Sequence, residues 1–193
     1  MANVPSTGPL APPPPVWDVR PVDTAVRYAG FWIRTVAAVI DGIILMVAGT
    51  IVSRFIVPPP VLPAEPKFNS FGEVYGYMNA VIEATTPVQM VVFWAALYWV
   101  YFAFQEASPA QATLGKRALG LRVSRVEGGR LDLAKATLRT WPMYLPAAAL
   151  LIGAGMSYFV YLIALISCLA VAFSSRKQGL HDRWAGAVVT RNQ

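Results

Sequence analysis

Three long apolar runs limit what this chain can fold into. They cover residues 29–57, 87–104 and 141–173, and the first reads AGFWIRTVAAVIDGIILMVAGTIVSRFIV. About 20 helical residues cross the ~30 Å hydrocarbon core of a bilayer, so the first two runs are long enough to span it. The sequence therefore predicts transmembrane helices at about 31–57 and 87–104.

The third run is too long for one ordinary span, because it extends over 33 residues. The segment Gly-Ala-Gly at 153–155 offers a turn near its middle. Division there predicts a short helix at 141–152, kinked by Pro142 and Pro146, and a full span at 156–173. The sequence leaves open whether the short helix starts earlier, spans the membrane or re-enters it. The expected fold class is an all-α membrane protein, a bundle of three to four transmembrane or re-entrant helices.

Proline dominates two segments outside these runs. Residues 58–60 are all proline and end the first helix, because proline lacks the amide proton and its ring blocks helical continuation. Residues 1–28 hold the run Pro12–Pro15 and little apolar periodicity, which predicts a disordered cytoplasmic arm. That arm is either a plain spacer or a polyproline ligand for a protein partner. Residues 29–190 form the predicted membrane domain.

The basic residues predict the orientation. Three lie at or before Arg34, seven lie in the loop 105–140, and four follow residue 174. The loop 58–87 carries one Lys and three Glu, a net charge of 1 − 3 = −2. The positive-inside rule therefore predicts that both termini are cytoplasmic. The formal net charge of +6 then reflects this topology and attraction to anionic lipid headgroups, not binding to nucleic acid.

The cytoplasmic loop 105–140 is expected to contain β structure. Apolar residues alternate with small or polar ones over 119–123 and again over 131–133, and Gly128-Gly129 lies between them where a tight turn needs positive φ. This pattern predicts a small β-hairpin, with residues 187–190 as a candidate third strand. Asp132 is expected to cap a helix that runs toward the membrane.

Composition and motifs exclude several functions. The chain is 56% hydrophobic and 13% charged, which is atypical of a soluble enzyme. One histidine, His181, and one cysteine, Cys168, are too few for a zinc site or an intrachain disulfide. No nucleotide-binding glycine loop, nucleophile elbow or zinc-protease pair occurs. We therefore expect no enzymatic activity, no metal and no cofactor.

Asp41 is the most informative residue, because it lies inside an apolar run. Ten residues from the expected inner boundary at Phe31 place it about 15 Å deep, where an ionised carboxylate costs about 2.5 to 3.5 kcal/mol. The same depth count on the second span selects Trp94 and Tyr98, whose N–H and O–H groups could donate to it. These three residues form a candidate ion or proton site; the alternative is that Asp41 only orders helix packing.

Three motifs resemble the RDD family of bacterial membrane proteins. They are GFWIRTVAAVIDGIIL at 30–45, TLGKRALGLRV at 113–123 followed by Arg139, and GLHDRWAGAVV at 179–189. The arginine and two aspartates that name the family fall on Arg34, Asp41 and Asp182. The resemblance implies a multi-span protein of the bacterial inner membrane whose activity is unsettled, with transport of cations or of an unidentified ligand commonly suggested.

Two functional expectations follow. The first is proton-coupled transport of cations or an unidentified ligand, for which a homo-oligomer is expected, because four short helices enclose little polar volume. The second is a membrane scaffold, adaptor or assembly factor in which Asp41 is structural. In either case Asp182 is expected to meet Arg34 or Arg139 at the membrane surface and dock the C-terminal tail on the bundle.

Overall fold

The computed structural model describes residues 26–191, so all but the last three residues of the predicted Pro-rich arm lie outside it. The elements, in chain order, are α1 (Phe31–Ile56), α2 (Phe71–Thr85), α3 (Val88–Trp99), the π-helix η2 (Val100–Phe104), α4 (Gln105–Ala107), α5 (Leu114–Ala118), β1 (Leu121–Arg125), α6 (Leu133–Ala149), α7 (Ala154–Phe173), α8 (Leu180–Trp184) and β2 (Ala187–Arg191).

The described chain is mostly helical, as its apolar runs predicted, and three of its helices are long and apolar enough to cross a membrane. They are α1, the continuous helix Val88–Ala107 made of α3, η2 and α4, and α7. Helix α6 begins at Leu133, well before the expected 141, because Asp132 caps it by accepting a hydrogen bond from the backbone N–H of Lys135 at 2.8 Å. Gly153 then joins α6 to α7 with a φ of 146°.

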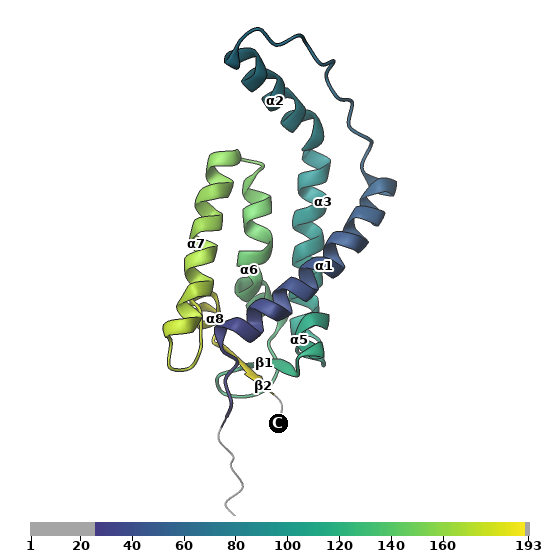
Figure 1. The fold of residues 1–193 in the computed structure, drawn as a ribbon. Coiled ribbons are helices and arrows are strands. Elements are labelled where there is room, and N and C mark those ends of the chain that lie inside the picture. The colour runs from purple at the N-terminus through teal and green to yellow at the C-terminus, as the bar shows by residue number, and fades with distance from the viewer. Residues whose placement is uncertain (1–25, 192–193) are drawn as a thin grey trace, which may run out of the picture.

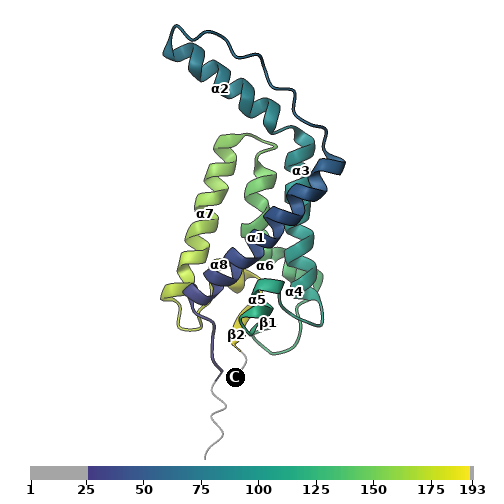
Figure 2. The same ribbon diagram turned by 45° about the vertical axis from the view of Figure 1, so that its right-hand side comes forward.

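The helices are arranged around one crowded end. Helices α6 and α7 run side by side, α3 lies next to α6, and α1 crosses the bundle obliquely (Figures 1 and 2). The strands, α5 and α8 gather at the end where α1 begins, which we call the strand end. Helix α2 lies beyond the opposite end and has no buried residue.

Helix α2 was not predicted, although its start signal is present in the sequence. Ser70 and Glu73 have the spacing of a capping box, and the Ser70 side chain accepts a hydrogen bond from the Glu73 N–H. Glu73 in turn accepts from the N–H of Asn69 at 2.7 Å. The loop 58–87 therefore contains a helix of its own.

One face of α1 is buried, and it is lined mainly by small residues. Its buried positions recur every fourth residue: Ala37, Asp41, Leu45, Gly49 and Ser53. A Cβ on Gly49 would lie only 2.5 Å from the ring of Trp94 in α3. The small side chains thus let α3 approach α1 closely, while the other faces of α1 expose apolar side chains.

The strand pair differs from the predicted hairpin in its partner. An antiparallel pair does form, but β1 pairs with β2, with Val123 opposite Val189, and not with residues 131–133. The turn at Gly128 and Gly129 has the expected positive φ, at 89° and 82°. Because Asp132 starts α6 immediately after this turn, residues 131–133 are not available as a strand, and the predicted third strand takes their place.

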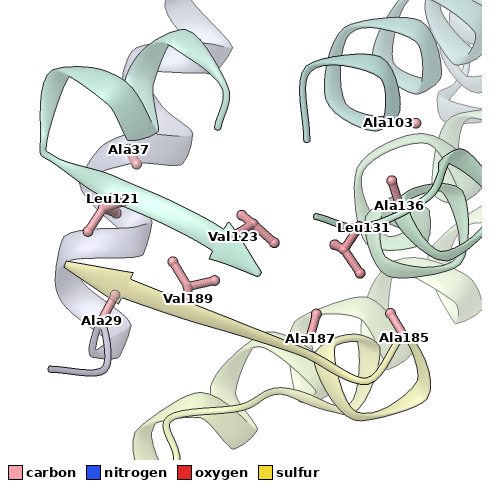
Figure 3. Close-up of a cluster of buried hydrophobic side chains, with 10 residues drawn as sticks. All are labelled: Ala29, Ala37, Ala103, Leu121, Val123, Leu131, Ala136, Ala185, Ala187 and Val189. Atoms are coloured by element: carbon pink, nitrogen blue, oxygen red, sulfur yellow. The ribbon is translucent and has the colours of Figure 1, made fainter. Parts of the chain in front are cut away.

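A small apolar core lies between the strands, α1 and α6 at the strand end (Figure 3). It contains Ala29, Ala37, Ala103, Leu121, Val123, Leu131, Ala136, Ala185, Ala187 and Val189. The backbone N–H of Ala29 donates to the carbonyl of Val189 at 2.8 Å, so the chain entering α1 extends the strand pair. The tail is therefore part of the folded core.

We predict that Leu131→Ala destabilises this end of the molecule. Leu131 is only 1% exposed, so its truncation leaves a cavity and should lower the free energy of unfolding by about 2–5 kcal/mol. Thermal unfolding of the purified protein in detergent measures the effect. Leu133→Ala, two positions away on an exposed side chain, is the control and should change the melting temperature much less. Equal melting temperatures for the two variants would contradict this account of the core.

Candidate functional site

Six ionisable side chains come together at the strand end. They are Arg34, Asp41, Glu106, Lys116, Arg139 and Asp182. Three are basic and three acidic, so their formal charges balance, and they come from α1, α4, α5, α6 and α8.

Asp182 lies between two arginines. Its Oδ2 accepts a hydrogen bond from Nη1 of Arg34 at 2.5 Å, and its Oδ1 accepts one from Nε of Arg139 at 2.8 Å. The backbone N–H of Gly179 also donates to Oδ2, at 3.1 Å, across the start of α8. The predicted contact of Asp182 with Arg34 or Arg139 is confirmed, and Asp182 contacts both.

Glu106 extends this set of ion pairs to a third cation. Nη1 of Arg139 donates to Oε2 of Glu106, and Nζ of Lys116 donates to Oε1. The result is one continuous chain of ion pairs, which we call the ionic chain: Arg34, Asp182, Arg139, Glu106, Lys116.

Arg34 also ties two backbone segments to the ionic chain. Its Nε donates to the carbonyl of Ala29 at 2.9 Å, and its Nη2 donates to the carbonyl of Lys177 at 2.5 Å. One guanidinium therefore fixes both the entry to α1 and the loop before α8, which a single ammonium group could not do with the same planar geometry.

The ionic chain is buried. Both carboxylates are fully inaccessible to solvent and Arg139 is 4% exposed. Burial alone would raise the pKa of Asp182, but the charges of Arg139 and Arg34 outweigh it and hold that pKa well below the usual range. For Lys116, burial prevails over the attraction of Glu106 and lowers the pKa below its ordinary value. Removing one member would leave an uncompensated buried charge.

Asp41 accepts three hydrogen bonds, and none comes from a charged group. The hydroxyl of Tyr101 and the backbone N–H of Gly115 donate to Oδ1 at 2.6 and 2.7 Å. The hydroxyl of Thr113 donates to Oδ2 at 2.6 Å. A Cβ on Gly115 would lie 2.3 Å from the Ala37 carbonyl oxygen, so only glycine lets α5 approach α1 this closely.

The prediction that Trp94 and Tyr98 donate to Asp41 was therefore wrong. Trp94 packs against Gly49, two turns further along α1, and Tyr98 stacks on Phe102 with ring centroids 6.2 Å apart. The second long helix continues past its apolar run to Ala107, and Glu106 in this extension is neutralised by its partners. Because the helix ends later than expected, Tyr101 and not Tyr98 lies opposite Asp41. An ion or proton role for Asp41, Trp94 and Tyr98 stays a prediction.

A π-helical turn, η2, lies at the same place. Wider turns of this kind occur frequently at functional sites, and they shift the face that later residues present. Within η2 and just after it, Phe102, Ala103 and Glu106 are buried. The turn thus helps to aim both Tyr101 and Glu106 into the cluster.

His181 joins α8 to α7 through Ser167. Its Nδ1 lies 2.8 Å from Oγ of Ser167, and its backbone N–H donates to the same oxygen at 3.0 Å. Its Nε2 lies 3.5 Å from Oδ1 of Asp182. Neutral imidazole satisfies this arrangement, with the Ser167 hydroxyl donating to Nδ1 and Nε2–H pointing to Asp182. Burial lowers the pKa of His181 to about 4 despite the attraction of Asp182.

A cavity of about 260 Å³ adjoins the ionic chain. Its charged lining residues are Arg34, Asp41, Glu106, Lys116 and Arg139, and most of its remaining wall is apolar. The apolar wall comes from α1, η2, α6 and α7 and includes Phe31, Ala38, Phe102, Pro142, Met143, Leu165 and Val171. Cys168 and His181 also line it. Within residues 26–191, no group of three or more His, Cys, Asp or Glu side chains could hold a metal ion.

Four residues of the site were not predicted from the sequence: Tyr101, Glu106, Thr113 and Lys116. Glu106 had a usable signal, since it is the one acidic residue between Glu83 and Glu127 and lies two residues after the end of an uncharged apolar run. The other three carry no comparable signal, because their role arises only when the loop after Ala107 folds back against α1.

Comparison with known proteins agrees with the motifs. The RDD family matches residues 28–186. This chain belongs to the RDD family. The uncharacterized protein YxaI of Bacillus subtilis (strain 168) is 29% identical to it over 159 residues, which cover 80% of this chain and 91% of that protein. No solved structure matches the chain. Family membership and three helices long and apolar enough to cross a bilayer identify a membrane protein.

We predict that Asp182→Ala releases the C-terminal tail of this RDD-family chain. The substitution leaves Arg34 and Arg139 facing each other without their shared anion, a loss of about 3–5 kcal/mol. Limited trypsin digestion of the purified protein should then cut faster at Lys177. In the wild type, the carbonyl of Lys177 accepts a hydrogen bond from Arg34. Asp132→Ala, which removes an exposed helix cap, is the control and should leave cleavage at Lys177 unchanged. Equal cleavage in wild type and Asp182→Ala would refute the docking.

We also predict acid destabilisation that depends on His181. Its pKa is about 4 when folded and about 6.5 when unfolded, so its contribution is complete above pH ~6.5. As the pH falls from 6.5 toward 4, the unfolded state takes up the proton first, and on the order of 3 kcal/mol is lost. Melting temperatures measured between pH 7.5 and 4.5 should fall in the wild type and stay flatter in His181→Asn. Since the sequence has one histidine, parallel curves would contradict the assignment.

Proposed function

We propose that this RDD-family chain is a small protein of the bacterial inner membrane, with cytoplasmic termini, that binds a cation or another small ligand in the cavity and carries out its proton-coupled transport. The observation that carries the proposal is the cavity itself, which lies directly against the ionic chain and Asp41.

Energetics support a binding role for this arrangement. A buried ion-pair network is often no more stabilising than well-packed apolar side chains of the same volume. A chain that only needed rigid packing could therefore do without these charges. Instead, five charged side chains face a space large enough for a small ligand.

Asp41 is the proposed proton-carrying group. It faces the cavity, and two of its three hydrogen bonds come from Thr113 and Gly115 at the start of α5, a five-residue helix. A small movement of α5 would remove both of these donors. Loading of the cavity and proton exchange at Asp41 would then be coupled through α5.

The proposal includes a homo-oligomer and contact with anionic headgroups. The cavity lies at one end of the bundle, so a complete pathway needs walls from a second copy. Large apolar side chains cover the outer faces of α1 and α7, and exposed basic side chains such as Arg122, Arg130 and Arg183 surround the strand end. It includes no catalytic step, because the Ser167 hydroxyl is buried and held by His181.

A scaffold or adaptor role is the second candidate. The observation that favours it is the set of three hydrogen bonds to Asp41, which hold α5 and η2 against α1. Under this function Asp41 needs only to accept hydrogen bonds and never changes its protonation.

Asp41→Asn separates the two functions. The amide keeps the size and one acceptor oxygen but cannot carry a proton, so ion-driven pH changes in proteoliposomes should be abolished while insertion and melting temperature change little. Tyr101→Phe is the matched control, because it removes one hydrogen bond and leaves the carboxylate in place. Retained pH changes in Asp41→Asn would overturn the transport proposal and favour the scaffold.

A further inference from the structure

The hydrogen bonds around the cavity leave donors spare. Each oxygen of Glu106 and of Asp41 already accepts at least one hydrogen bond. Lys116 uses one of its three N–H bonds, and among residues 26–191 no acceptor lies on Nη2 of Arg139. A ligand that supplies acceptor oxygens would complete this set.

The charges that face the cavity are also unequal. Arg34, Lys116 and Arg139 line it, against Glu106 and Asp41, which gives 3 − 2 = +1. The sixth member, Asp182, is fully buried behind the arginines and does not line the cavity. The side chains that a ligand meets are therefore three cations and two carboxylates, although Asp182, 2.5 Å from Arg34 and 2.8 Å from Arg139, balances the charge of the whole cluster.

Most of the rest of the wall is apolar and includes Met143, Leu165 and Val171. The volume of about 260 Å³ is below the usual range of about 300–1,000 Å³ for drug-sized ligands. A compact apolar body would displace water from this part of the cavity.

We propose that the cavity binds a small amphiphile whose monoanionic head, a carboxylate or a phosphate monoester anion, accepts hydrogen bonds from Lys116 and Arg139 and whose apolar body packs on α6 and α7. This inference names a ligand class for the proposed transport site. It rests on the proposed function only in treating the bound molecule as the one that is transported. The head chemistry is the same whether the ligand comes from the bilayer or from water.

Cys168 supplies the assay, because it lines the cavity and is the one cysteine in the sequence. The rate of its modification by a small methanethiosulfonate reagent is measured on the full chain in nanodiscs of zwitterionic lipid. Decanoate should slow modification at lower bilayer concentrations than decanol, and decyltrimethylammonium should be weakest. Protection by benzoate as well would indicate a water-borne ligand, and protection by decanoate alone would indicate one that enters from the bilayer.

Lys116→Gln tests the head-group contact. It should weaken protection by decanoate about tenfold, the factor equivalent to ~1.4 kcal/mol, and leave protection by decanol unchanged. Lys135→Gln, on an exposed side chain of α6, is the matched control and should behave as wild type. If Lys116→Gln does not fold, Lys116→Arg takes its place in the test. This variant keeps the charge and should retain the preference for decanoate. Wild-type melting temperature should likewise rise more with decanoate than with decanol.

Equal protection by decanoate and decanol in wild type, or an unchanged preference in Lys116→Gln, would overturn the inference. Its failure is distinct from that of the transport proposal. If decanoate binds selectively but Asp41→Asn shows unaltered pH changes, the ligand site stands and the proton-coupling proposal fails. If Asp41→Asn abolishes the pH changes but decanoate does not bind selectively, proton coupling stands and the anionic ligand is wrong.

Discussion

The ionic chain from Arg34 to Lys116 is the interaction on which the rest of the structure depends. It links five helices, α1, α8, α6, α4 and α5, through alternating charges that are almost completely buried. Each carboxylate is shared by two cations, and Arg139 is shared by both carboxylates. Because every charge has its counter-charge on another element, no helix can leave the cluster without exposing a buried, unpaired ion.

The apolar core and the ionic chain stabilise the same end of the molecule by different means. The core contains many alanines, so it buries little area per residue, but small side chains let α1, α6 and the strands approach closely. That close approach brings Arg34, Arg139 and Asp182 within hydrogen-bond distance. The opposite end has neither feature, and α2 accordingly has no buried residue.

A cavity next to such a network has a mixed character that suits a ligand. Its charged side chains are preorganised, since the cations are held in place by their carboxylate partners before any ligand arrives. Its apolar side chains come from helices whose other faces expose large apolar residues. Asp41 lies where the cavity, α1 and α5 meet, so the same carboxylate can report on ligand binding or simply hold α5 in position.

The sequence by itself determined the approximate limits of the three helices long and apolar enough to cross a membrane, the cap at Asp132 and the turn at Gly128-Gly129. It also determined the contact of Asp182 with the arginines. These features depend on local hydrophobicity, on turn chemistry and on pairing of opposite charges. Only the tertiary structure decided that β1 pairs with β2, that Tyr101 rather than Trp94 or Tyr98 donates to Asp41, and that Glu106 joins two cations. These contacts join residues far apart in the chain, and they depend on the oblique path of α1, the π-turn at η2 and the folding back of α5, none of which leaves a periodic signal in the sequence.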